Sequence, residues 1–471
     1  IGVMKFSRHV WIIGALVVMT FFSSNPIQAQ VVALQGPAAK QPPVHPESQL
    51  PSLHVFDLPK AAQYLDSANG YTLDQLTDLA IKRSPAMEAA RQDIARAEGE
   101  LRQAGYRPNP TFDFERTRNP VSAPENGYVF GLTLPFELGG KRQRRIEVAR
   151  LELNIAEKNL ADTERVLRAE LKSVYGELIT AIANLRFTEE LFDINQEFFR
   201  IVQVRFDEGE GSGLDRNLLM VEINRLQIER VSAHQNVTDF LLQLRQLVRL
   251  DQDEPIKVRG VLDTVPISVT REGMLLTASI DRPDLQAARL LEEKSASFVR
   301  LQKSSAIPNL NTVFRYSLDN SYFDDFYALT GNGRLGNIRD NDKLLTVGIS
   351  IELPLFNRNQ GAISAATAQG AQSRAQRQLL EQIIRREVQT ALSRYESSIR
   401  NLSILTQYVL PGAQMNIQTL RGAYEAGQLR LIDVLTEQRK LIEVQNGVRN
   451  AQLAVFQAQN DLERAIGRPL Q

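Results

Sequence analysis

Residues 141–206 contain no proline, and apolar side chains recur along this stretch at every seventh position. The series runs Ile146, Leu153, Leu160, Leu167, Val174 and Ala181. This spacing is typical of a coiled-coil helix. At about 1.5 Å per residue, the helix would be about 100 Å long. The pattern therefore predicts a rod rather than a compact globular domain.

A second helical stretch begins at residue 360 and repeats apolar residues at the same spacing: Val388, Tyr395, Leu402 and Val409. We expect Pro411–Gly412 to interrupt it. Each long stretch leads into a glycine-bearing turn, at 209–213 and at Gly427, and we expect a returning helix after each turn. The sequence therefore predicts two antiparallel helical hairpins. The Gly-x-Gly-x-Gly string of the first turn would suggest a phosphate loop only if it followed a strand.

Two other zones, around 110–136 and 309–352, alternate apolar and polar residues with the period of two that is typical of strands. Segments of about ten residues with one apolar face and aromatic members are characteristic of a transmembrane β-barrel. We expect two strands in each zone, joined by turn-rich stretches at 119–127 and 319–343. The predicted lipid-facing residues are Tyr128, Phe130, Leu132, Leu134, Leu345, Val347, Ile349 and Ile351.

Four strands cannot close a barrel, because unpaired edge groups in hydrocarbon cost several kcal/mol each and known barrels have about eight strands or more. The chain must therefore oligomerise. A dimer would give eight strands with a filled lumen, and a trimer would give twelve with room for a channel. An ordinary sheet covered by the helices in a soluble protein remains the alternative.

The chain is duplicated. Pro85 returns as Pro283 after 198 residues and Pro108 as Pro308 after 200, whereas Gly131 returns as Gly348 after 217. An insertion of 17 residues has therefore entered the strand zone of the second copy. We expect repeat 1 at 71–250, a linker at 251–270 and repeat 2 at 271–471. Acidic residues in the inserted stretch are expected in a solvated extracellular loop rather than a calcium site: Asp324, Asp325, Asp340 and Asp342.

The first thirty residues resemble an export signal. Lys5 and Arg8 precede an apolar run over 10–22 that is too short for a permanent membrane span. We expect cleavage after Ala29, with no cysteine there for lipid attachment. Six prolines in residues 31–60 then predict an extended arm over 30–70, and Thr72 with Gln75 forms a capping box that opens the first helix.

The amino-acid composition reduces the range of possible functions. Lys plus Arg and Asp plus Glu both number 55, so the neutral charge gives no argument for nucleic acid binding. The chain has no cysteine and only four histidines, which are not spaced as metal ligands. We therefore expect neither an enzyme, nor a cofactor, nor a resident metal.

Duplicated halves, paired strands, long helices and G-x(5)-D turns together resemble the TolC-like outer-membrane efflux proteins over residues 71–470. The segments PFELGGKR at 135–142 and LPLFNRNQG at 353–361 are similar to the heavy-metal branch, the outer-membrane component of cobalt-zinc-cadmium exporters. The fold implied is mainly α, with two tandem repeats and a small β part.

That resemblance implies a homotrimer in the outer membrane of a Gram-negative bacterium. Twelve strands, four from each chain, would form the barrel, and the coiled-coil helices would continue it as a periplasmic α-barrel. A periplasmic adaptor and an inner-membrane pump of the resistance-nodulation-division class would dock at the helical tips. The chain itself would be a passive, gated duct.

By the same resemblance, the hairpin turns carry the adaptor contacts and the gate. Aspartates in three copies would form carboxylate rings that favour cations, and two arginines would hold the closed state through ion pairs. The same aspartates could instead cap the returning helices. These turn residues are Gly209, Leu214, Asp215, Arg216, Gly427, Arg430, Leu431, Ile432 and Asp433.

The leading interpretation is an exit duct for divalent heavy-metal cations. Two alternatives stay open: a duct of the same fold for drugs or for protein secretion, and a soluble periplasmic coiled-coil scaffold.

Overall fold

The computed structural model describes residues 58–118, 126–251, 256–260, 262, 270–329 and 331–470. The chain divides into two units, Ile1–Ser52, which lies outside these residues, and Leu53–Gln471. The predicted signal peptide, most of the proline-rich arm and part of the predicted linker therefore fall outside the described residues. Everything below concerns the second unit.

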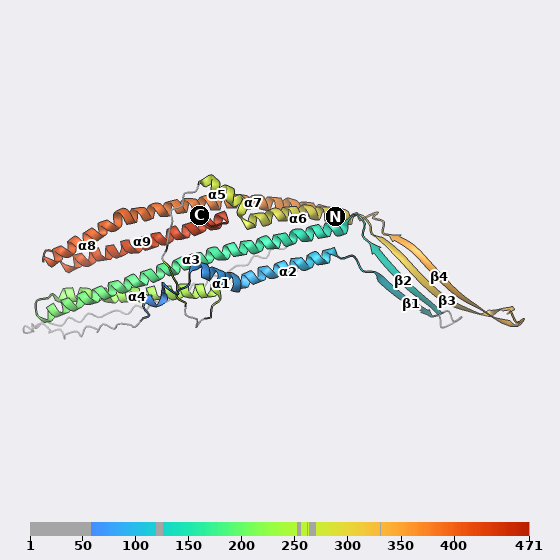
Figure 1. Ribbon diagram of the computed structural model, residues 1–471, viewed down its shortest axis with the longest axis horizontal. Helices are drawn as coiled ribbons and strands as arrows, with labels where there is room; N and C mark the ends of the chain where they lie inside the picture. Colours follow the sequence, from blue (N-terminus) through green and yellow to red (C-terminus); the bar gives the residue numbers. More distant parts are fainter. Residues whose placement is uncertain are drawn as a thin grey trace, which may run out of the picture. The chain divides into compact units, whose positions relative to one another are not determined.

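The same order of elements occurs twice in this unit, as the duplication predicts (Figure 1). The first copy follows a short 3₁₀ turn, Ala61–Tyr64, and comprises α1 (Leu73–Arg83), α2 (Pro85–Gly105), β1 (Thr111–Arg118), β2 (Asn126–Phe136), α3 (Lys141–Asp207) and α4 (Gly213–Val248). The second comprises α5 (Arg271–Asp281), α6 (Pro283–Ser305), β3 (Leu310–Leu329), β4 (Leu335–Ile351), α7 (Gln360–Ile404), α8 (Leu410–Glu425) and α9 (Leu431–Ile466). The mainly helical fold with a small β part is confirmed.

Local sequence signals account for the helix ends. Thr72 Oγ1 accepts a hydrogen bond from the Gln75 backbone N–H at 3.3 Å, and Gln75 Oε1 accepts one from the Thr72 N–H at 3.0 Å. This is the predicted capping box. Pro85 and Pro283 open α2 and α6, where a missing N–H costs no helical hydrogen bond.

The predicted interruption at Pro411–Gly412 takes an unexpected form. The helix does not end there. It passes through a π-helical turn, Leu405–Val409, and continues as α8, with Pro411 in the first turn. The π turn inserts a residue immediately before the proline, so the chain accommodates the missing N–H without breaking the rod.

The four strands form one antiparallel sheet in the order β1-β2-β3-β4. Because β2 pairs with β3, the two copies join at the centre of the sheet. In the part of the chain that the structure describes, no helix packs on this sheet. Figure 1 shows the strands beyond one end of the helices. This arrangement argues against the alternative of a sheet covered by helices.

The prediction of a turn-rich loop over 319–343 was wrong. β3 and β4 have 20 and 17 residues, whereas β1 and β2 have 8 and 11. The inserted residues therefore extend the second strand pair, with an irregularity in the pairing between Phe323 and Tyr327. The four acidic residues assigned to a solvated loop lie on these strands instead: Asp324 and Asp325 on β3, and Asp340 and Asp342 on β4.

The helices bury their heptad stripes in two main clusters. Around the middle of α3, Leu171, Leu178 and Leu185 are fully buried with residues of α1 and α4. The second cluster joins α5, α7 and α9, where Val388, Tyr395 and Leu462 are buried together. The earlier members of the α3 series, such as Leu153, are only half-buried.

Candidate functional site

One face of the sheet is a continuous apolar surface. Directly paired residues of antiparallel strands point to the same face. One row across the sheet is Phe112, Leu132, Phe314 and Val347, and the next is Phe114, Phe130, Tyr316 and Leu345. All eight side chains are exposed. The predicted lipid-facing residues of β2 and β4 are thus brought together on one face, although their contact with lipid stays a prediction.

The opposite face is more polar and contains small residues. Asp113, Gly131, Arg315 and Thr346 form one row on this face. Gly131 is the small member, since a Cβ placed there would lie 3.3 Å from the Asp113 Cβ. This face also carries some apolar residues, such as Leu344, which is 60% exposed beside Leu345 at 69%. The sheet therefore has one apolar side and one side that mixes polar, small and apolar residues.

The two hairpin turns lie at the other end of the helices. Gly209 and Gly427 have φ of +80° and +70°, in the left-handed region where glycine is favoured. Ser212 caps α4, because its Oγ accepts the Leu214 N–H at 3.2 Å. Asp215 therefore does not cap α4 but lies in its first turn.

Asp433 does act as a cap. Its Oδ2 accepts the Arg430 backbone N–H at 3.3 Å and lies 3.7 Å from Arg430 Nε. The capping alternative is therefore confirmed for Asp433 and wrong for Asp215, where serine takes that role. Because Arg430 is highly exposed, its ion pair contributes little to stability.

Arg216 lies within its own hairpin. Its guanidinium carbon sits 4.2 Å from the centre of the Phe206 ring, a cation–π contact between α4 and the end of α3. Among the described residues it forms no ion pair. The prediction that Arg216 and Arg430 hold a closed state through ion pairs between chains remains a prediction.

An apolar cluster joins the two turns. Leu431 is completely buried with Val202, Leu219 and Leu435, although we expected it as an adaptor or gate contact. Ile432 is half-buried. Leu214, in contrast, is 66% exposed. The buried Leu431 holds the hairpins together, whereas Leu214 remains available at the surface.

Tyr424 and Phe198 belong to the same junction and were missed by the sequence analysis. Their rings meet edge to face, with centroids 6.4 Å apart. Burial raises the pKa of Tyr424, and the nearby Asp215 carboxylate raises it further against the opposing effect of Arg205. Asp215 of the first hairpin therefore lies close to Tyr424 of the second.

A buried ion-pair network lies behind this cluster. Glu222 on α4 is 1% exposed and accepts hydrogen bonds from Arg225 at 2.5 Å and from Arg439 of α9 at 2.7 Å. Burial alone would raise the pKa of Glu222, but the two arginines outweigh it and hold the pKa below its usual range. Glu222 occupies an otherwise apolar stripe, and nothing in the sequence indicated its partner 217 residues away.

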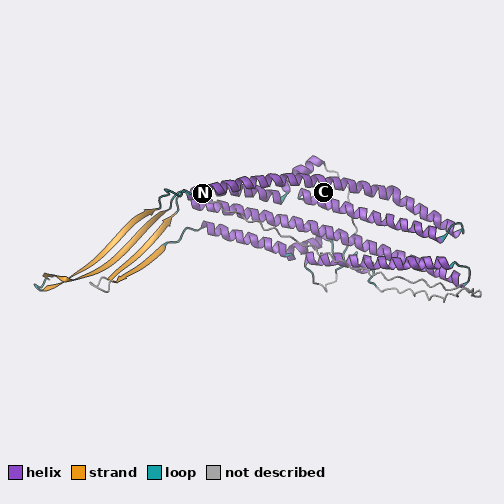
Figure 2. Ribbon diagram, turned by 180° about the vertical axis from the view of Figure 1, so that it is seen from behind, coloured by secondary structure: helices purple, strands orange, loops and turns teal. Residues whose placement is uncertain are grey.

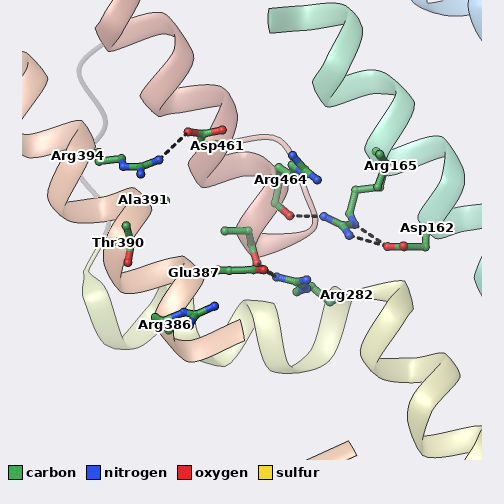
Figure 3. A pocket seen from close by; sticks show the side chains of 12 residues that line it. Asp162, Arg165, Arg282, Arg386, Glu387, Thr390, Ala391, Arg394, Asp461 and Arg464 are labelled. Carbon is green, nitrogen blue, oxygen red and sulfur yellow. Dashed lines mark hydrogen bonds and ion pairs between the residues drawn. The ribbon is translucent and has the colours of Figure 1, made fainter. Parts of the chain in front are cut away.

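A second charged junction lies where α9 ends (Figure 3). Arg282 is 4% exposed, and its guanidinium lies 2.6 Å from both Asp284 and Glu387. It also donates to the Ala465 carbonyl at 3.1 Å, while Arg165 donates to the Arg464 carbonyl at 2.6 Å. The two arginines thus satisfy final carbonyls of α9 that lack helical partners. A cavity of about 490 Å³ adjoins the junction.

The family model for outer membrane efflux proteins matches residues 76–248 and 276–468. The chain belongs to this family. Both matched segments coincide with the two structural copies, so the resemblance drawn from the sequence is confirmed. A sheet with one apolar face, continued by long helical hairpins, agrees with membership of this family.

Individual relatives and solved structures agree with this family assignment. The cobalt-zinc-cadmium resistance protein CzcC of Cupriavidus metallidurans is 24% identical over 409 residues, covering 86% of this chain and 91% of CzcC. The outer membrane protein TolC of Vibrio cholerae is 21% identical and covers 83% and 87%. The crystal structure of CusC, a protein that forms a transmembrane channel, superposes with a TM-score of 0.69 at 17% identity, covering 90% of this chain and 99% of CusC. This efflux family member therefore has the fold of those channels.

Within the described ranges, no helix is long and apolar enough to cross a membrane. Those ranges also contain no group of three or more histidine, cysteine, aspartate or glutamate side chains arranged to hold a metal ion.

Proposed function

We propose that this outer-membrane efflux protein is one third of a passive exit duct that conducts divalent heavy-metal cations. The observation that carries the proposal is the sheet, whose apolar face is exposed across all four strands. Such a face needs lipid, and its polar reverse suits a water-filled lumen. Membership of the efflux family supports the direction of transport.

The sheet is an open arc. Among the residues that the structure describes, the order β1-β2-β3-β4 gives β1 and β4 one partner strand each. In hydrocarbon those edges must pair with further copies, and twelve strands from three copies would leave a channel. CusC, which has the same fold and forms a transmembrane channel, supports this assembly.

The duct needs no energy source of its own. A periplasmic adaptor and an inner-membrane resistance-nodulation-division pump would supply substrate at the hairpin turns. Leu214, Gly427 and Arg430 are exposed turn residues that such a partner could contact. The metal assignment is supported by the name of CzcC, a cobalt-zinc-cadmium resistance protein.

Cells that carry the adaptor and pump test this proposal directly. Adding this chain should lower the zinc, cobalt or cadmium retained after a metal load, measured by elemental mass spectrometry. Cells without the chain should retain metal, since the pump then has no exit. Unchanged metal content, together with restored tolerance of organic drugs or restored protein secretion, would show that the duct serves another cargo.

The turn aspartates give a sharper prediction. In three copies, Asp215 and Asp433 would place six carboxylates near the entrance, and such rings favour cations. Changing both to asparagine should reduce the preference for cations over anions, measured as a reversal potential in planar bilayers. Asparagine preserves capping at position 433. Asp239→Asn, farther along α4, should leave selectivity unchanged; equal selectivity in all three proteins would contradict the gate.

A further inference from the structure

Four short connections join one end of the sheet to the helices. They span residues 106–110, 137–140, 306–309 and 352–359. Figure 2 shows all four as loops between the strands and the helices. The strand ends are level, because Phe136, Leu310 and Ile351 pair directly in the last row of the sheet. The connections therefore form one band across the molecule.

A large apolar side chain is exposed in or beside each connection. Tyr106, Phe136, Ile307 and Phe356 are 64%, 49%, 43% and 91% exposed. Phe136 shares the apolar face of the sheet with Leu134, since alternate residues of a strand lie on the same face. Aromatic side chains are typical of the boundary between hydrocarbon and headgroups. The band therefore continues the apolar surface to the level where headgroups would begin.

One exposed cation accompanies each connection. Arg107 and Arg358 lie within two of the connections. Arg142 lies in the first turn of α3 and Lys303 in the last turn of α6. Within the described ranges, none of these four side chains forms an ion pair. We call the four connections and these four cations the junction band.

Few acids oppose the cations of the junction band. Its four connections contain two acids, Glu137 and Glu352. Glu137 is already bonded by Arg145, whose Nη2 lies 3.0 Å from the Glu137 Oε2. The junction band therefore has an excess of positive charge beside exposed apolar side chains.

A cavity of about 510 Å³ beside the first connection shows where an anion can be held. Arg107 lines this cavity, together with Glu137, Arg145 and Glu100 at the end of α2. Both acids are already paired, because Glu137 binds Arg145 and Glu100 accepts a hydrogen bond from Arg96 at 2.7 Å. Arg107 is thus the lining cation that has no ion pair within the described chain. An anion in the cavity would meet an unneutralised guanidinium.

We propose that the junction band binds the headgroups of anionic phospholipids in the periplasm-facing leaflet. The inference rests on the proposed duct, which places the apolar sheet face in the membrane, and it adds the class of lipid. Unpaired cations beside exposed apolar side chains complement a lipid phosphate beside its acyl chains. The long stems of lysine and arginine let their charged ends reach the headgroups. A zwitterionic headgroup carries its own cation and therefore neutralises these side chains less well.

Native mass spectrometry tests the lipid class. The detergent-extracted protein is equilibrated with equal amounts of phosphatidylglycerol, which is anionic, and phosphatidylethanolamine, which is zwitterionic. The natural protein should retain phosphatidylglycerol in preference. The triple variant Arg107→Gln, Lys303→Gln and Arg358→Gln should lose this preference, by about fivefold for each cation removed. Arg142 is left in place because it donates a hydrogen bond to the Gly105 carbonyl.

A matched control removes the same charge elsewhere. Arg271, Arg385 and Arg400 are exposed, lie on α5 and α7 away from the sheet, and form no ion pair within the described ranges. Their triple change to glutamine should leave the preference for phosphatidylglycerol as in the natural protein. A loss of equal size in the control would mean that net charge, rather than the junction band, selects the lipid.

The remaining outcomes separate this inference from the proposed function. Equal retention of the two lipids by the natural protein, or an unchanged preference in the first triple variant, would overturn the junction band as a lipid site and leave the duct standing. An altered ion selectivity in that variant, with lipid retention unchanged, would place its cations in the lumen instead. A natural protein that retained neither lipid and stayed soluble without detergent would contradict the duct itself.

Discussion

Leu345→Arg should abolish assembly of the chain in the outer membrane, whereas Leu344→Arg should be tolerated. The two residues are neighbours on β4 and similarly exposed, at 69% and 60%. They differ in the face they occupy, because Leu345 pairs with Tyr316 in the apolar row and Leu344 pairs with Ser317. Arginine at the lipid face of a barrel costs about 2–4 kcal/mol near the midplane, and every copy of the duct would carry it.

Fractionation measures this result. Outer membranes are isolated by density gradient, and the folded oligomer is followed as a heat-sensitive band in gel electrophoresis. The Leu345→Arg protein should be absent or degraded, and the Leu344→Arg protein should accumulate as the wild type does. If both variants assembled equally well, the assignment of the apolar row to lipid would be wrong.

Arg282→Met should destabilise the helical part strongly for a single change. Arg282 is buried between α5 and α6, bonds both Asp284 and Glu387, and satisfies the end of α9. Methionine preserves much of the volume but leaves Asp284 with only the more distant Arg165, 3.9 Å away. Breaking a buried ion pair costs about 3–5 kcal/mol. Because Glu387 is partly exposed and can rehydrate, the lower end of about 3 kcal/mol applies here.

Arg394→Met is the matched control at the same cavity (Figure 3). Arg394 is 68% exposed and lies 3.7 Å from Asp461, so its loss should change stability by about 0–1 kcal/mol. Denaturant unfolding of both proteins in the same detergent, followed by helical circular dichroism, supplies the comparison. Equal midpoints for the two variants would mean that the Arg282 junction does not hold the helices together.

The sequence predicted the architecture correctly in segments where one periodicity of apolar residues continues over many positions. The heptads after Lys141 and from residue 360 predicted helices that begin at Lys141 and Gln360, because apolar spacing and the absence of proline agree there. In β2, the alternation of apolar and polar residues predicted which side chains share the apolar face, because one periodicity again continues along the whole strand. A one-residue slip would have moved Phe130 to the polar face.

Other features depended on partners distant in the sequence. The inserted stretch of repeat 2 is rich in turn-forming residues, yet it pairs with itself as β3 and β4 because cross-strand hydrogen bonds outweigh local preference. Glu222 and Arg439 are 217 residues apart, so nothing local indicates their ion pair. At the turns, Ser212 rather than Asp215 caps α4, because the helix begins at Gly213, one residue after the serine.

The central claim is that four strands per chain are too few to close a barrel, so that three copies complete it. The mass of the detergent-solubilised particle, measured by native mass spectrometry after detergent removal in the gas phase, tests this most directly. The account predicts three copies of the mature chain. A particle containing one copy, folded and with its apolar strand face intact, would contradict it.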